Sequence, residues 1–314
     1  MFRGWQFTAP HQPLELVEKP EPAPGPGQVL IATRAAGLCH SDIGFLEGNI
    51  DWMLAVRPII LGHECAGEIV QLGPGVEDWK VGDRVAVAGL GLDAPGLVAD
   101  GGFGEKFVGK VEQLVRIPES VDYVQAAAAT DAGQTARKAL RLAEVGPGRR
   151  VGIIGLGGLG LTAAKMAVML GAEVLAVEIN ESVWPFAQEA GVKRIVSTPQ
   201  ELADEELDAF VDYAGFGVTT AGAIEAVKHG GIVVQVGMGR KEATIDTTQL
   251  VSREVILRGS LGGSYADTED VLRLMGEGLR VTATEIEFEE VPEGLARLER
   301  GEVNGRLVIG YPAT

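Results

Sequence analysis

Three residues of types that bind transition metals stand upstream of a glycine-rich turn. Cys39 lies in the run GLCHSD, His63 in LGHE and Asp131 in ATDAG, and the turn GLGGLG spans residues 155–160. One thiolate, one imidazole and one carboxylate can hold a zinc ion whose fourth position stays open to a substrate. A Lewis acid beside a dinucleotide site predicts redox chemistry on a C–O bond.

Each of these residues alone has a simpler interpretation. A lone cysteine such as Cys39 is most often a small buried hydrophobe. His63 alone would be a hydrogen-bonded structural histidine, and Asp131 alone would be a helix cap. Their combination within specific local contexts favours a metal site over three independent structural roles.

Composition narrows the classes of protein. With 314 residues and 46% hydrophobic content, the chain can form one large domain or two ordinary ones. A net charge of -17 argues against a surface for nucleic acid or anionic membranes and is typical of a well-solvated protein. The two cysteines, Cys39 and Cys65, imply no disulfide framework, and we expect a cytoplasmic location. We predict neither a secretory signal at the N-terminus nor a membrane span.

The element pattern changes along the chain. The first third predicts β-strands, at Val29–Thr33, Gly67–Leu72 and Asp83–Val87, because short apolar runs there are bounded by Gly and Pro. An Ala-rich stretch from Tyr123 to Ala143 predicts a helix that Gly133 interrupts.

From Val151 onward, strands and helices alternate. The predicted helices include Leu159–Leu170 and Thr219–Lys228, and the six predicted strands are Val151–Ile154, Glu173–Val177, Arg194–Val196, Ala209–Asp212, Ile232–Val236 and Val255–Leu257. This alternation predicts an α/β fold with a doubly wound parallel sheet. A helix near Glu293–Arg300 and a strand at Arg306–Gly310 follow. We place the dinucleotide-binding domain at 133–260 and the catalytic domain at 1–132 and 261–314.

The glycine turn follows an apolar strand and opens an apolar helix, which strengthens its interpretation as a dinucleotide site. Gly155 permits the tight turn, Gly157 lets the backbone approach a pyrophosphate, and Gly160 allows close packing of helix on strand. Glu178 ends the next strand, where a carboxylate accepts hydrogen bonds from ribose hydroxyls and repels a 2′-phosphate. No Arg or Lys lies between Glu178 and Gln188, so we expect NAD in preference to NADP.

Several motifs together resemble the zinc-dependent alcohol dehydrogenases of the medium-chain dehydrogenase/reductase superfamily, specifically the bacterial type with Asp as the third ligand. The resemblance covers essentially the whole chain, and its motifs in this sequence are GLCHSD, LGHECAG, VGDRV, DAGQT, the glycine turn, Val236-Gly237 and NGRLV at 304–308. It implies a β-rich, GroES-like catalytic domain built from both chain ends, with a Rossmann domain inserted between them. It also implies one catalytic zinc, NAD, a small alcohol or carbonyl substrate, and a homodimer or homotetramer.

The resemblance implies a role for each matching residue. Cys39, His63 and Asp131 would bind the zinc, with Glu64 beside the metal or exchanging with a ligand. Asp42 would hold the far nitrogen of His63, and Ser41 would take the alcohol proton. The implied cofactor contacts are His40, Thr135, Gly155, Gly157, Gly158, Leu159, Gly160, Glu178, Gly237, Met238, Leu261 and Arg306, of which His40 and Arg306 would approach the pyrophosphate.

Three positions depart from the family's pattern. The family's lobe for a structural zinc carries four cysteines, whereas residues 88–102 here contain none, so we expect a short loop held by packing or by a neighbouring subunit. Gly44 stands where some relatives complete the proton relay with a histidine, so water or His40 would carry the proton onward. Cys65 follows His63-Glu64 directly, and we expect it to be a packed small residue.

Two other functions stay open at this point. A zinc-free quinone or enone reductase of the same superfamily would not need Cys39, His63, Glu64 and Asp131 together. A non-enzymatic dinucleotide-binding protein could reuse the fold, because fold does not fix function.

Overall fold

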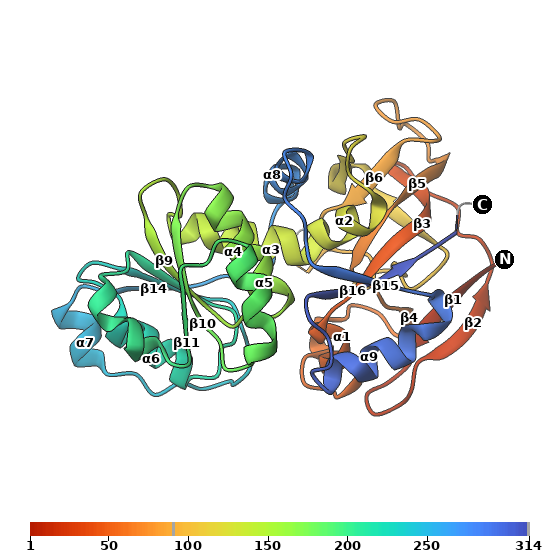
Figure 1. Ribbon diagram of the computed structural model, residues 1–314. Helices are drawn as coiled ribbons and strands as arrows, with labels where there is room; N and C mark the ends of the chain where they lie inside the picture. The colour runs from red at the N-terminus through yellow and green to blue at the C-terminus, as the bar shows by residue number, and fades with distance from the viewer. Residues whose placement is uncertain (90–91, 313–314) are drawn as a thin grey trace. The chain divides into compact units, whose positions relative to one another are not determined.

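The computed structural model describes residues 1–89 and 92–312, which form two compact units (Figure 1). The first unit combines Met1–Gln134 with the segment that begins at Gly262, and the second is Thr135–Leu261. Among the described residues, no helix is long and apolar enough to cross a membrane.

The first unit is built mostly on antiparallel strands from both ends of the chain, with one parallel pair, β15 and β16. Its larger sheet has the order β15-β16-β3-β5-β6-β8, with β7 paired to β3, and its smaller sheet has the order β2-β1-β4. The strands are β1 Phe2–Phe7, β2 Glu15–Lys19, β3 Gln28–Leu38, β4 Ile59–Ile60, β5 Glu64–Leu72, β6 Arg84–Val87, β7 Lys106–Lys110, β8 Leu114–Arg116, β15 Ala283–Ile286 and β16 Arg306–Gly310. The helices are α1 His40–Leu46, α2 Tyr123–Ala128, α8 Tyr265–Gly276 and α9 Val291–Glu299.

The long strand β3 organises this unit. It pairs with β5, with β7 and with the C-terminal strand β16, where Leu307 lies opposite Leu38. Its side chains are buried along most of its length, which explains why the sequence there is mostly apolar apart from Gln28, Thr33 and Arg34. The strand ends at Leu38, so the residues that begin α1 follow directly from the core of the sheet.

The second unit is a six-stranded parallel sheet in the order β11-β10-β9-β12-β13-β14. Its strands are β9 Arg150–Ile154, β10 Glu173–Val177, β11 Arg194–Val196, β12 Ala209–Asp212, β13 Ile232–Gln235 and β14 Ile256–Gly259. Its helices are α4 Gly158–Met169, α5 Trp184–Glu189, α6 Val218–Ala226 and α7 Thr247–Ser252. The strand order reverses between β9 and β12, and such a switch point is where open α/β sheets bind ligands. The predicted doubly wound sheet is therefore confirmed.

The predicted interruption of the helix at Gly133 is wrong. The chain stays helical from α2 through a π-helical turn, Ala129–Gly133, into α3, Gln134–Leu142. Gly133 has another purpose, because a Cβ atom there would lie 2.7 Å from Cγ1 of Val271. The glycine thus allows α8 to approach the helix closely.

Candidate functional site

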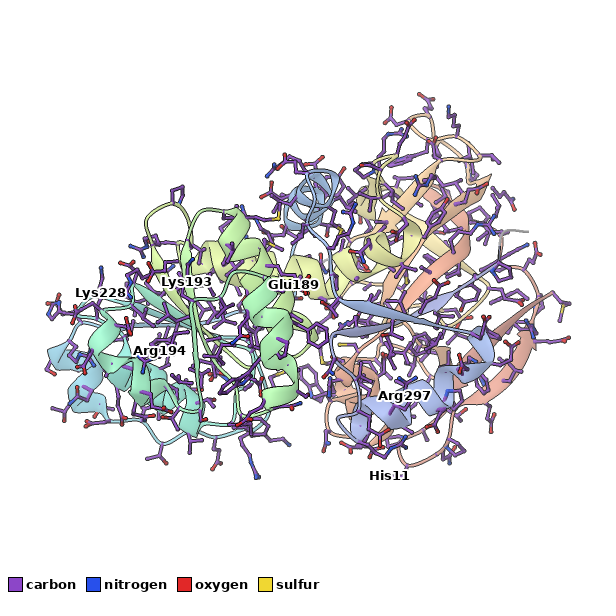
Figure 2. All side chains as sticks on the ribbon, in the orientation of Figure 1. His11, Glu189, Lys193, Arg194, Lys228 and Arg297 are labelled. Carbon is purple, nitrogen blue, oxygen red and sulfur yellow. The ribbon has the colours of Figure 1, made fainter. Side chains whose placement is uncertain are left out.

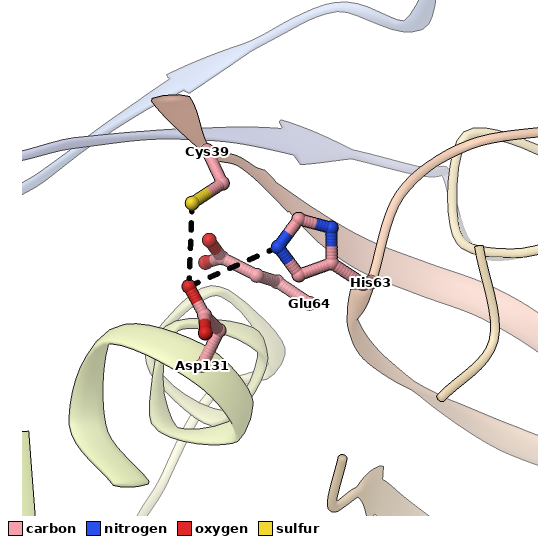
Figure 3. Close-up of side chains that lie close together, drawn as sticks. All are labelled: Cys39, His63, Glu64 and Asp131. Atoms are coloured by element: carbon pink, nitrogen blue, oxygen red, sulfur yellow. Dashed lines mark hydrogen bonds and ion pairs between the residues drawn. The ribbon is translucent and has the colours of Figure 1, made fainter. Parts of the chain in front are cut away.

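Four metal-ligating side chains from distant parts of the chain meet in the first unit. Cys39 precedes α1, His63 precedes β5, Glu64 begins β5, and Asp131 lies in the π-helical turn. One ligand atom from each residue can be chosen so that all four lie within 4.8 Å of one another (Figure 3). The sequence places these residues up to 92 positions apart, and the sheet and helix bring them together.

The cluster fits a zinc ion in both chemistry and dimensions. Sγ of Cys39 lies 3.4 Å from Oδ2 of Asp131, and Nε2 of His63 lies 4.0 Å from the same oxygen. Zinc bonds of about 2.0–2.3 Å in tetrahedral geometry separate the ligand atoms by roughly 3.3–3.8 Å. Small shifts of the side chains would therefore complete the coordination. A soft thiolate combined with imidazole and carboxylate favours zinc over magnesium or calcium.

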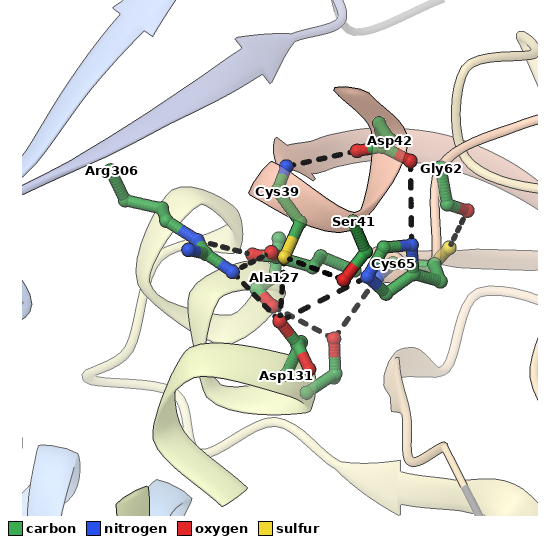
Figure 4. Close-up of polar contacts among 11 residues, drawn as sticks. Cys39, Ser41, Asp42, Gly62, Cys65, Ala127, Asp131 and Arg306 are labelled. Carbon is green, nitrogen blue, oxygen red and sulfur yellow. Dashed lines mark hydrogen bonds and ion pairs between the residues drawn. The ribbon is translucent and has the colours of Figure 1, made fainter. Parts of the chain in front are cut away.

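Asp42 contacts both Cys39 and His63, and Figure 4 shows its contact with Cys39. Its Oδ2 accepts a hydrogen bond of 2.9 Å from the backbone N–H of Cys39, and its Oδ1 lies 3.5 Å from Nδ1 of His63. The carboxylate is completely buried. Burial lowers the pKa of His63, but the charges of Asp42 and Cys39 outweigh that effect and raise this pKa well above its usual value. Nδ1 faces Asp42 and Nε2 faces Asp131, so Nε2 is the nitrogen that would bind a metal once its own proton has left.

Arg306 lies beside the cluster and is 2% exposed. Its guanidinium donates hydrogen bonds to both oxygens of Glu64 and, at 2.7 Å, to Oδ2 of Asp131. Burial raises the pKa of Glu64 to about 7 despite the opposing charge of Arg306. Gly37 makes the space for this carboxylate, because a Cβ there would lie 2.1 Å from Oε2 of Glu64. Sequence reasoning assigned Arg306 to a pyrophosphate and missed its pairing with Glu64, 242 positions away.

Thr130 connects the π-helical turn to β5. Its hydroxyl accepts a hydrogen bond of 3.1 Å from the backbone N–H of Cys65 and donates one of 2.8 Å to the carbonyl of Ala127. This fixes the neighbouring Asp131 relative to the strand that begins with Glu64. Sequence reasoning missed Thr130, although a hydroxyl one residue before a ligand was a usable signal.

The segment expected to replace the structural-zinc lobe packs against the residues that precede His63. The backbone N–H groups of Gly101, Gly102 and Phe103 donate hydrogen bonds to the carbonyls of 60–62 at 2.8–2.9 Å. Asp100 accepts a hydrogen bond of 2.8 Å from the backbone of Ile60 and pairs with Lys19. Residues 90–91 of the predicted loop lie outside the described part of the chain.

Glycines make this packing close. A Cβ on Gly96 would lie 2.6 Å from the carbonyl oxygen of Gly62, and a Cβ on Gly101 would lie 2.3 Å from the same atom. Ala94, Leu97 and Phe103 are buried in the core of the unit. Packing within the unit therefore holds the described part of this segment, 92–104.

Cys65 belongs to the structural surroundings of the cluster. Its Sγ contacts the carbonyl oxygen of Gly62 at 3.2 Å, and burial raises the pKa of the thiol to about 12. A thiol held protonated in this way is a poor metal ligand. Ser41, by contrast, lies next to the ligands, with its Oγ 3.5 Å from Sγ of Cys39, and His40 is exposed at the first turn of α1.

The glycine turn in the second unit has the geometry of a phosphate-binding loop. Gly155 adopts a φ of +80°, and a Cβ on Gly160 would lie 1.7 Å from the carbonyl oxygen of Gly155. A Cβ on Gly157 would meet no atom of the described residues within 4 Å, so the backbone there faces open space among them. The N-terminus of α4, at Gly158 and Leu159, begins directly after it.

Glu178 lies beside this turn at the end of β10. Its Oε2 accepts a hydrogen bond of 2.6 Å from the backbone N–H of Leu156, and its Oε1 accepts one of 2.7 Å from Asn180. Of the other expected cofactor contacts in this unit, Thr135 is buried, whereas Met238 and Leu261 are exposed. Gly237 follows β13 with its N–H 2.9 Å from the carbonyl oxygen of Asp212.

Comparison with known proteins agrees with this architecture. Residues 25–119 match the family model of the alcohol dehydrogenase GroES-like domain, and residues 158–277 match that of the zinc-binding dehydrogenases. An alcohol dehydrogenase of Geobacillus stearothermophilus is 30% identical, over 95% of this chain and 96% of its own length. An alcohol dehydrogenase of a Moraxella strain is 30% identical over 96% of both chains.

Solved structures extend the likeness to the fold. The acetophenone reductase of Geotrichum candidum, determined with NAD, superposes with a TM-score of 0.90 at 30% identity, over 99% of this chain and 97% of that chain. A thermostable alcohol dehydrogenase of Pyrobaculum aerophilum superposes with a TM-score of 0.88 at 26% identity, over 99% of both chains. The first unit is thus a GroES-like domain and the second a Rossmann domain. The chain belongs to the zinc-containing alcohol dehydrogenases of the medium-chain dehydrogenase/reductase superfamily.

Proposed function

We propose that this chain interconverts an alcohol with an aldehyde or ketone, with NAD as the hydride carrier. The observation that carries the proposal is the cluster of Cys39, His63, Glu64 and Asp131, of which the first three are buried and Asp131 is partly buried. When bound, zinc would acidify an alcohol oxygen and NAD would accept the hydride. A zinc-free reductase has no use for four ligand-type side chains held in this arrangement.

The residues around the cluster support distinct roles. Cys39, His63 and Asp131 would hold the metal, and Asp42 would fix the ring of His63 through Nδ1. Ser41 would accept the alcohol proton, since its Oγ lies 3.5 Å from the Cys39 sulfur. With Gly44 in the relay position, water or the exposed His40 would pass that proton to solvent.

Glu64 and Arg306 form a buried ion pair beside the other residues of the metal cluster. The guanidinium balances the charge that Glu64 and Asp131 bring together, and a permanent cation suits this purpose. Glu64 would stay beside the metal and exchange with a ligand only when released from Arg306. The guanidinium N–H groups of Arg306 that do not donate to these carboxylates would approach a pyrophosphate.

In the Rossmann unit, the glycine turn would receive the pyrophosphate at Gly157–Gly160, and Glu178 would accept the ribose hydroxyls. We propose that Thr135, Gly237, Met238 and Leu261 contact the nicotinamide. Likeness to the NAD-bound acetophenone reductase supports the choice of cofactor and suggests aryl ketones as first substrates. We further propose a homodimer or homotetramer in a reducing, cytoplasmic setting, which light scattering and localisation would test.

The test combines metal analysis with turnover. Protein purified without added metal should contain close to one equivalent of zinc per chain, because residues 92–104 hold no Cys or His for a second site. The purified protein is then assayed with NAD and primary, secondary, cyclic and aryl alcohols. No zinc after supplementation, together with enone reduction, would favour the zinc-free reductase. Cofactor binding without turnover on any alcohol or carbonyl would favour the non-enzymatic alternative.

A further inference from the structure

Asp212 is a completely buried carboxylate at the C-terminal end of β12, the strand next to the switch point of the parallel sheet. None of the roles above uses it. We infer that Asp212 is a positioning residue that fixes the turns after β12 and β13 in the shape required by the dinucleotide. The inference rests on the proposed function, since it concerns how the Rossmann unit receives NAD.

The carboxylate of Asp212 accepts four hydrogen bonds from the turn and helix that follow β12. Oδ1 accepts from the backbone N–H groups of Ala214 at 3.0 Å and Gly215 at 2.8 Å. Oδ2 accepts from the hydroxyls of Thr219 at 2.7 Å and Thr220 at 2.8 Å. A buried carboxylate is tolerated only when its oxygens are satisfied in this manner, and hydrogen bonds to a charged acceptor are strong.

The same residue holds the turn after β13. Its backbone carbonyl accepts hydrogen bonds of 2.9 Å from the N–H groups of Val236 and Gly237. The hydroxyl of Thr220 also contacts Oε1 of Gln235, whose Nε2 donates a hydrogen bond of 2.6 Å to the carbonyl of Gly237. Asp212 therefore connects both turns, one through its side chain and the other through its backbone and Thr220.

The two turns, and the glycine turn after β9, are packed too closely to move independently. Gly215 adopts a φ of +66°, and a Cβ there would lie 2.0 Å from the carbonyl oxygen of Gly237. A Cβ on Gly155 would lie 3.1 Å from Cβ of Ala214. Loss of the Asp212 hydrogen bonds would therefore displace the backbone at all three strand ends, where a dinucleotide binds.

The other end of β12 offers a matched control. Asp208 accepts a hydrogen bond of 2.7 Å from the backbone N–H of Arg150 and pairs with Lys228, which is labelled in Figure 2. It lies just before β12, at the N-terminal edge of the sheet, away from the turns that would receive the cofactor. Asp208→Ala removes one backbone hydrogen bond and the ion pairs with Lys228 and Arg149, whereas Asp212→Ala removes four hydrogen bonds at the opposite end of the same strand.

The experiment is a fluorescence titration of the zinc-loaded protein with NADH. Asp212→Ala should raise the Kd at least tenfold and Asp208→Ala less than twofold, although both lower the melting temperature. Thr220→Val should weaken binding several-fold, and Thr220→Ser should restore it because the hydroxyl returns. Zinc content should be equal in all four variants.

The outcomes separate this inference from the proposed function. Wild-type protein that fails to bind NADH would refute the proposed function itself. Wild-type affinity in Asp212→Ala would overturn the role of Asp212. If Asp212→Ala does not fold, Thr220→Val decides, and an unchanged Kd in that variant would overturn the inference.

Discussion

Replacing Asp100 with alanine is expected to loosen the segment that takes the place of the structural-zinc lobe. Oδ1 of Asp100 accepts the backbone N–H of Ile60 at 2.8 Å, and Nζ of Lys19 lies 2.9 Å from Oδ2. A hydrogen bond to a charged group contributes about 1.5–3 kcal/mol. The ion pair adds about 0.5–1 kcal/mol, because both side chains keep roughly a quarter to a third of their exposure.

The sum predicts that Asp100→Ala lowers the free energy of unfolding by about 2–4 kcal/mol. For a unit of this size, the melting temperature should fall by something on the order of 10 °C. Lys19→Met removes only the ion pair and should cost about 0.5–1 kcal/mol. Asp100→Asn keeps an oxygen for Ile60 and should fall between the two.

Urea unfolding of the zinc-free protein measures these free energies without a contribution from the metal. The rate of zinc release to a chelator provides a second measurement. Asp100→Ala should release zinc faster than Lys19→Met, because residues 60–62 lead directly into His63. If Asp100→Ala costs no more than Lys19→Met, the hydrogen bond to Ile60 does not hold the segment and the reasoning fails.

Three further predictions concern the metal, the cofactor and the pH dependence. Cys39→Ala should abolish zinc binding and turnover while NADH still binds, and a wild-type zinc content by elemental analysis would contradict the ligand assignment. Glu178→Ala should reduce the preference for NAD over NADP in kcat/KM, because it removes both the repulsion of a 2′-phosphate and the hydrogen bonds to the ribose hydroxyls. An unchanged ratio of the two kcat/KM values would refute the role of Glu178. Burial would raise the pKa of Asp208, but hydrogen bonds from Lys228 and the Arg150 backbone outweigh it, so the pKa is lowered on folding. A depressed carboxyl pKa stabilises the fold above its unfolded value of about 3.9, and this contribution disappears as the pH falls through the folded value. Asp208→Asn should therefore have a lower free energy of unfolding than wild type at neutral pH, and the two free energies should become equal in acid. If the two curves of unfolding free energy against pH stay parallel, the role given to Asp208 is wrong.

The parallel sheet was the most predictable part of the fold. The central strands β10 and β12 are short and almost completely buried, so the predicted ranges Glu173–Val177 and Ala209–Asp212 coincide with them. The predicted range Arg194–Val196 coincides with the edge strand β11, which is partly exposed. The strands β1 and β2 were not predicted, because much of their length is only partly buried and polar residues interrupt the pattern. Their place in a sheet depends on partners far along the chain.

The metal cluster could be proposed from local motifs, whereas its surroundings could not. Glu64 and Arg306 are partners across 242 residues, and neither motif indicates that the other will supply the opposing charge. The close packing of Gly96 and Gly101 against Gly62 could not be predicted either, because a glycine in a loop indicates only a turn. Contacts between residues far apart in the sequence determine both features.

The π-helical turn at Ala129–Gly133 has a consequence for how this stretch can change in length. A turn of this kind closes its hydrogen bonds over five residues, so it contains one residue more than an α-helix of the same rise. Deleting a single residue from 129–133 would convert the wide turn into a regular helix whose flanking parts keep their directions, while residues inside the turn change direction by up to roughly 100°. Asp131, in the middle of the turn, would then no longer face Cys39 and His63. We expect insertions and deletions to be tolerated at exposed loops but to disrupt the metal site at residues 129–133, where the number of residues matters as much as their identity.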